Sequence, residues 1–163
     1  MAGAGEAHNL IALNVAAGLR NQVRGGPCRV FIADMKLRVA EWNAFYYPDL
    51  MVVCNPADNH AHFKEQPGTV IEVMSPTTER IDRREKLLAY RTLTSLREYV
   101  LIAQDRRRIE VYRKDANGIL QHEVLSAGEP LWFETVNASL TQDAVYEDVK
   151  LAPNSPKAAE VIT

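Results

Sequence analysis

The chain has 163 residues, of which 47% are hydrophobic and 25% are charged, and its formal net charge is −2. This length is typical of one domain with a sizeable core, and the near-neutral charge argues against a generally basic nucleic-acid-binding protein. No apolar run approaches the roughly 18 residues of a membrane span. Its two cysteines, Cys28 and Cys54, lie too far apart for a CxxC motif, so we expect a reduced, cytoplasmic protein without a zinc site or a disulfide framework.

The first expected element is a helix from Glu6 to Val23, because its apolar residues recur at steps of three and four. Gly25, Gly26 and Pro27 then end the helix. His8 lies in the first turn, on the same face as the apolar stripe. A histidine in this position is more often a surface or packing residue than part of a site, and both interpretations stay open.

Four strands are predicted next, from short runs rich in Val, Ile, Phe and Leu. The runs are Cys28 to Ala33, Lys36 to Val39, Phe45 to Cys54 and Val70 to Met74. Between the last two runs, residues 55–68 are polar and contain two prolines, which predicts an exposed loop. His60 and His62 belong to this loop, and we assign them no role.

The last two of these strands each carry one acid, Asp49 and Glu72. Burying a carboxylate in such an apolar run costs several kcal/mol unless it binds a cation or is fully hydrogen-bonded. If the strands are neighbours, the two acids converge, and Mg²⁺ is a cation that one or two carboxylates commonly hold. Pro48 precedes Asp49 and is typical of an irregular point in a sheet. The alternative is that Asp49 only caps a turn at the start of the strand.

A second helix is expected from Glu79 to Leu93, with Thr77 or Thr78 as its N-cap. Asp82, Lys86 and Tyr90 are spaced four residues apart and therefore share one face. A solvent-facing Asp–Lys pair would contribute only about 0.3–0.5 kcal/mol. The alternative is that the lysine reaches back to the end of the preceding strand.

Further strands are predicted at residues 99–103, 108–113 and 119–124, followed by peripheral elements to Val149 and a loose tail at 151–163. A basic cluster at a turn between two of these strands comprises Arg106, Arg107 and Arg108, together with Arg113 and Lys114. Such clusters are usually solvated, but this one is also able to meet a phosphate backbone.

Four motifs in order resemble the Uma-type putative restriction endonuclease family, a bacterial group within the PD-(D/E)XK nuclease superfamily. They are Tyr47-Pro48-Asp49, Glu72-Val73-Met74-Ser75-Pro76-Thr77-Thr78, the helix face from Asp82 to Tyr90, and Ser95-Leu96-Arg97-Glu98-Tyr99. The resemblance implies an α/β (α+β) fold with a restriction-endonuclease-like core, in which helices flank a mixed central β-sheet. It also implies a single nuclease-like domain over residues 1–150.

The resemblance implies that Asp49 and Glu72 are the metal-binding acids, with Mg²⁺ or alternatively Mn²⁺ as the cofactor. The chain departs from the pattern at Met74, where the superfamily has its lysine, and Lys86 on the next helix is the natural substitute. Asp49, Glu72 and Lys86 are therefore the expected catalytic residues. The residues expected around them are His8, Ser75, Asp82 and Tyr90.

The function implied by the resemblance is a metal-dependent endonuclease that hydrolyses phosphodiester bonds of DNA. One alternative is a catalytically inactive module of the same fold that binds nucleic acid or protein. Another is a phosphoesterase that acts on a small substrate. Nothing in the sequence identifies the residues that contact nucleic acid, and uncovered edge strands favour a homodimer.

Overall fold

The computed structural model describes residues 5–76 and 79–151. In these residues the helices are α1 (Glu6–Val23), α2 (Glu79–Tyr90) and α3 (Gln142–Val145), with a 3₁₀ turn at Ala40–Trp42. The strands are β1 (Arg29–Ile32), β2 (Lys36–Val39), β3 (Ala44–Tyr46), β4 (Leu50–Val53), β5 (Phe63–Lys64), β6 (Thr69–Met74), β7 (Glu98–Ala103), β8 (Ile109–Lys114), β9 (Leu120–Val124), β10 (Leu131–Phe133) and β11 (Ala138–Leu140).

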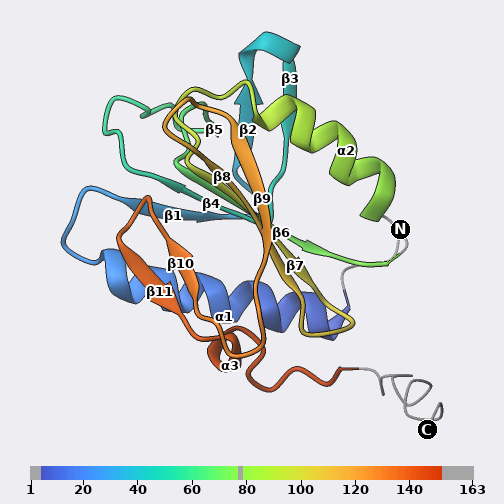
Figure 1. Ribbon diagram of the computed structural model, residues 1–163. Coiled ribbons are helices and arrows are strands. Elements are labelled where there is room, and N and C mark those ends of the chain that lie inside the picture. The colour runs from blue at the N-terminus through green and yellow to red at the C-terminus, as the bar shows by residue number, and fades with distance from the viewer. Residues whose placement is uncertain (1–4, 77–78, 152–163) are drawn as a thin grey trace, which may run out of the picture.

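A six-stranded sheet forms the centre of the fold, in the order β1-β4-β6-β7-β8-β9. Its β6–β7 pair is parallel and the other pairs are antiparallel, so the sheet is mixed, as the sequence predicts. Helix α1 lies along one face and α2 over the other (Figure 1). The small sheet β3-β2-β5 sits beside α2, and the β10–β11 hairpin lies against α1 (Figure 1).

Two apolar clusters hold the helices on the sheet, one on each face. Alternate residues of a strand point to opposite faces, so Ile71 and Val73 of β6 join the cluster under α1, whereas Val70 joins the cluster under α2. Glu72 therefore points to the α2 face, in the same direction as Val70. A charged side chain among buried apolar residues needs partners on that face.

The chain from Phe45 to Cys54, predicted as one strand, forms two strands that belong to different sheets. Strand β3 pairs with β2, and β4 pairs with β1 and β6. Pro48 lies between them, where the chain passes from one sheet to the other, because proline cannot donate to a regular ladder. The break leaves Asp49 immediately before β4.

The prediction of an exposed loop at residues 55–68 is also wrong in part, because β5 pairs with β2 there. Lys64 of β5 is buried, and its Nζ donates to the backbone carbonyls of Asp58 and His60 at 3.1 and 2.9 Å. Helix α1 has the predicted bounds, and α2 ends at Tyr90 rather than Leu93. The predicted N-cap at 77–78 and residues 152–163 of the predicted tail lie outside the described residues.

The two cysteines form a disulfide, so the expectation of an unpaired, reduced pair is wrong. Strands β1 and β4 pair antiparallel with Arg29 opposite Val53, and continuing this register places Cys28 opposite Cys54. Their Cα atoms lie 3.9 Å apart although 26 positions separate them in the sequence. Within the described residues, none of the helices combines the length and apolar character that crossing a membrane requires.

The disulfide predicts a measurable loss of stability on reduction. Replacing Cys28 and Cys54 together by serine should lower the free energy of unfolding by about 2–4 kcal/mol, because the cross-link restricts the unfolded chain. Urea unfolding of the oxidised protein, the reduced protein and the double variant measures the difference. The reduced protein should match the double variant, and equal stability of all three samples would contradict the prediction.

Candidate active site

The two predicted acids lie side by side at one end of the central sheet. Strands β4 and β6 pair antiparallel with Leu50 opposite Ile71, so continuing the register places Asp49 opposite Glu72. Asp49 Oδ2 accepts a hydrogen bond of 2.8 Å from the backbone N–H of Val73. This hydrogen bond holds the carboxylate of Asp49 beside that of Glu72. Asp49 therefore does more than cap a turn.

Helix α2 brings two side chains onto Glu72 from above the sheet. Lys86 Nζ lies 3.1 Å from Glu72 Oε2, and the Tyr90 hydroxyl donates to the same oxygen at 3.3 Å. The two residues are one helical turn apart and therefore face the sheet together. The side chain of Glu72 is only 8% exposed and that of Lys86 is 24% exposed. The predicted pairing of Lys86 with the end of the preceding strand is thus present.

His8 reaches Asp49 from the other layer of the protein. It lies in the first turns of α1, and its Nε2 is 3.2 Å from Asp49 Oδ1. The hydrogen bond to Asp49 raises the pKa of His8 above its ordinary value of 6.5, and partial burial opposes this rise. Each acid therefore has a basic partner from a different helix, one from each side of the sheet.

Burial makes Glu72 an unusual carboxylate. Removal from water raises its pKa from 4.5 to about 7, and the neighbouring charge of Asp49 adds to the rise. The Lys86 ammonium acts in the opposite direction. Burial, together with Glu72, also raises the pKa of the Tyr90 hydroxyl, so Tyr90 stays a hydrogen-bond donor at neutral pH. A strongly shifted carboxyl group beside a second acid is typical of functional sites.

The donor atoms at the acid pair suit a hard divalent cation. Asp49 and Glu72 offer carboxylate oxygens from adjacent strands, and Mg²⁺ is commonly bound through one or two carboxylates with water in its other positions. In the described ranges no group of three or more His, Cys, Asp or Glu side chains has the arrangement of a metal site. A cation here would therefore rely on the two carboxylates, the backbone and water.

The other predicted neighbours are placed less directly. Ser75 follows β6 and is half-buried, and Asp82 belongs to α2 with its side chain outside the described residues. Met74, in the position where the superfamily has lysine, packs against the apolar cluster under α2. Glu110, Arg83 and His122 meet two strands away from Glu72 and were not predicted from the sequence. The available signal was an acid between Ile109 and Val111 in an apolar strand.

The mixed central sheet with a helix on each face is a restriction-endonuclease-like fold. A solved structure with a TM-score of 0.72 has a similar fold, over 89% of this chain and 83% of that one, at 15% identity. It is described as a putative nuclease belonging to DUF820 from Anabaena variabilis. Residues 1–143 match the model of the Uma2 family, described as putative restriction endonucleases, and the chain belongs to this family.

Two uncharacterized proteins from Synechocystis are similar in sequence. One, slr1290, is 29% identical over 150 residues, which cover 90% of this chain and 77% of the relative. The other, sll1609, is 33% identical over 117 residues, which cover 70% of this chain and 66% of the relative. The resemblance found in the four motifs is confirmed by the family match over residues 1–143.

The raised pKa of Glu72 predicts a specific pH dependence of stability. Between pH 4.5 and about 7 the folded protein keeps this proton and the unfolded chain loses it, so the contribution of Glu72 to the free energy of unfolding falls as the pH rises. The total fall is at most about 3 kcal/mol. Urea unfolding without divalent cations at pH 5 and pH 8 should show a larger fall in wild type than in Glu72→Gln, because the raised pKa of His8 contributes a fall in both proteins. Equal falls in the two proteins would contradict the prediction.

Proposed function

We propose that the protein is a metal-dependent endonuclease that hydrolyses phosphodiester bonds of DNA. The observation that carries the proposal is that Asp49, immediately before β4, lies beside Glu72 of the adjacent strand β6, with Lys86 Nζ 3.1 Å from Glu72. These are the charged groups of a PD-(D/E)XK site, with the lysine supplied by α2 instead of by position 74. Membership of the Uma2 family and the fold shared with a protein described as a putative nuclease support the same activity.

Asp49 and Glu72, together with the backbone carbonyl of Val73, would hold Mg²⁺ or Mn²⁺. The ion would supply Lewis-acid chemistry, which polarises a phosphoryl oxygen and lowers the pKa of water. With the ion bound, Glu72 would carry its negative charge in a buried setting, where electrostatic interactions are strong. The raised pKa of Glu72 without the ion is consistent with this coupling, because a cation favours the ionised carboxylate.

Lys86 is placed to orient the attacking water or to offset negative charge that develops on the phosphate. Its ammonium group lies 3.1 Å from the Glu72 carboxylate, and its side chain is partly exposed. Tyr90 holds Glu72 in position through its hydroxyl, and His8 and the Val73 N–H hold Asp49. These three groups act as positioning residues for the carboxylates.

The second candidate is a nuclease-fold module that binds nucleic acid or protein without cleaving it. It is favoured by the ion pairs themselves, because Lys86 and His8 give each acid a partner within the protein. Met74 in the usual lysine position also favours a module that does not cleave nucleic acid. In this case Asp49 and Glu72 would have a structural role. A phosphoesterase acting on small substrates would use the same residues in a closed pocket.

The proposed endonuclease should cleave supercoiled plasmid with Mg²⁺ or Mn²⁺ and stop when the ion is chelated. Lys86→Ala should lower the rate by about 10²–10³-fold, the range for removing one transition-state donor. Asp49→Asn and Glu72→Gln should reduce cleavage to background. Gel electrophoresis of plasmid over a time course measures the rates, with bis(p-nitrophenyl) phosphate as the small-substrate comparison.

Glu147→Ala and Lys150→Ala are matched controls, because both positions are exposed and follow α3. They should cleave plasmid at the wild-type rate. Folded wild-type protein that cleaves no DNA with either ion would overturn the proposal and favour the binding module. Cleavage of the small diester alone would instead favour the phosphoesterase.

A further inference from the structure

A second charged cluster lies on the same face of the sheet as Glu72. In the β6–β7 and β7–β8 pairings Glu72 is opposite Leu101, and Leu101 is opposite Glu110. The two acids therefore share one row across the sheet, about 10 Å apart, because adjacent strands are separated by about 4.8 Å. The side chain of Glu110 is only 4% exposed, so it too requires partners.

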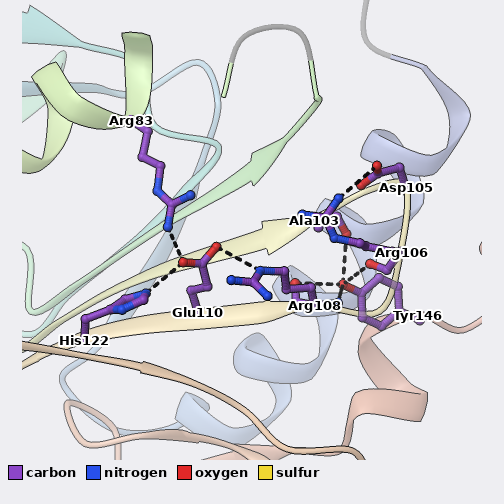
Figure 2. Close-up of polar contacts among 8 residues, drawn as sticks. All are labelled: Arg83, Ala103, Asp105, Arg106, Arg108, Glu110, His122 and Tyr146. Atoms are coloured by element: carbon purple, nitrogen blue, oxygen red, sulfur yellow. Dashed lines mark hydrogen bonds and ion pairs between the residues drawn. The ribbon is translucent and has the colours of Figure 1, made fainter. Parts of the chain in front are cut away.

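Three basic side chains converge on Glu110 from three elements (Figure 2). Arg83 reaches it from α2, Arg108 from the residue before β8, and His122 from β9. Arg108 Nε lies 3.4 Å from one carboxylate oxygen, and His122 Nε2 lies 2.8 Å from the other. The guanidinium groups of Arg83 and Arg108 outnumber the single carboxylate of Glu110, so the cluster is positively charged even when the imidazole of His122 is neutral. The whole chain, in contrast, has a net charge of −2.

The run of three arginines divides between two places in the structure. Arg106 pairs with Asp105 at 3.3 Å, and Arg107 pairs with Asp143 at 2.6 Å. Arg108 instead turns toward Glu110, on the α2 face (Figure 2). The basic cluster expected from the sequence is therefore not one patch, and Arg108 is the member that contacts Glu110.

Helix α2 and a series of rings join the two clusters rigidly. Arg83 and Lys86, one turn apart on α2, contact Glu110 and Glu72 respectively. Beneath them the rings of Tyr90, Tyr99, Tyr112 and His122 follow one another, with centroid distances of 5.1, 6.2 and 4.6 Å. Packed side chains of this kind hold the second cluster at a constant distance from Glu72.

We propose that Arg83, Arg108 and His122 bind a backbone phosphate of the nucleic acid beside the bond that is cut. This inference rests on the proposed function, because it assigns a second contact to the same substrate. The acid pair repels a polyanion, so affinity must come from positive charge nearby. Guanidinium groups match phosphate oxygens in geometry, and Glu110 holds Arg108 and His122 in place while each stays 41% exposed.

A purely structural role explains only part of the cluster. The contact between Arg83 and Glu110 fastens α2 to the sheet, and this would explain one basic residue. Arg108 and His122 both come from the sheet itself, so they add nothing to the attachment of the helix. The exposed guanidinium of Arg108 and the exposed imidazole of His122 are better explained by an anion that approaches along this face.

The test measures binding of a short fluorescein-labelled DNA duplex in EDTA, by anisotropy at a series of KCl concentrations. Loss of one phosphate contact in Arg108→Gln should make the slope of log K against log salt shallower by about 0.9 and weaken binding about eightfold at 0.1 M salt. Arg108→Lys should keep the wild-type slope, because it keeps the charge. Arg107→Gln is the matched control, since this neighbour pairs with Asp143 instead, and it should bind like wild type.

An unchanged slope in Arg108→Gln, an equal loss in Arg107→Gln, or no binding by wild type would each overturn the phosphate site. A second measurement needs no variant: the duplex should protect Arg108 from phenylglyoxal in wild-type protein and leave Arg107 reactive, as read by mass spectrometry. Equal protection of both would also overturn it. Because neither measurement involves cleavage, failure of the nuclease proposal is separately visible in the plasmid assay.

Discussion

The antiparallel register between β4 and β6 is the constraint on which the site depends. It places Asp49 opposite Glu72, so that the backbone N–H of Val73 donates a hydrogen bond to the Asp49 carboxylate. A shift by one residue would turn Glu72 to the α1 face, because side chains alternate along a strand. The apolar residues on both sides of Glu72 thus determine where its carboxylate points, and the same packing removes it from water.

Helix α2 supplies the side chains that pair with the acids placed by this register. Its face toward the sheet carries Lys86 and Tyr90 above Glu72 and Arg83 above Glu110, so one docking event supplies partners for two buried acids. A buried carboxylate without such partners would be costly. The electrostatics of the site and the attachment of the helix to the sheet are therefore coupled.

Much of this arrangement could be predicted from the sequence, and the reasons are local. The spacing of apolar residues predicted α1 with its observed bounds. One acid in each of two apolar runs predicted that Asp49 and Glu72 would meet if the two strands were neighbours, as β4 and β6 are. The four-residue spacing of Lys86 and Tyr90 predicted that they share a face. The two helix signals depend on residues close together in the chain, whereas the meeting of Asp49 and Glu72 also required that their strands be neighbours.

The features that were missed depend on pairings between distant segments. Nothing near Cys28 or Cys54 shows that β1 and β4 are neighbours, so their disulfide could not be read from spacing. The short strand β5 is recognised only through its pairing with β2. Glu110 likewise looks like an ordinary polar position of an alternating strand until α2 and β9 bring Arg83 and His122 to it.

The most direct test of the central claim is to locate the metal ion. Crystals soaked in Mn²⁺ should show an anomalous peak between the carboxylates of Asp49 and Glu72, with Lys86 still beside the site. The same soak of Asp49→Asn crystals should show no peak there. An empty site in wild-type crystals, with the Lys86–Glu72 ion pair unchanged, would contradict a metal-dependent nuclease and leave the two acids as structural residues.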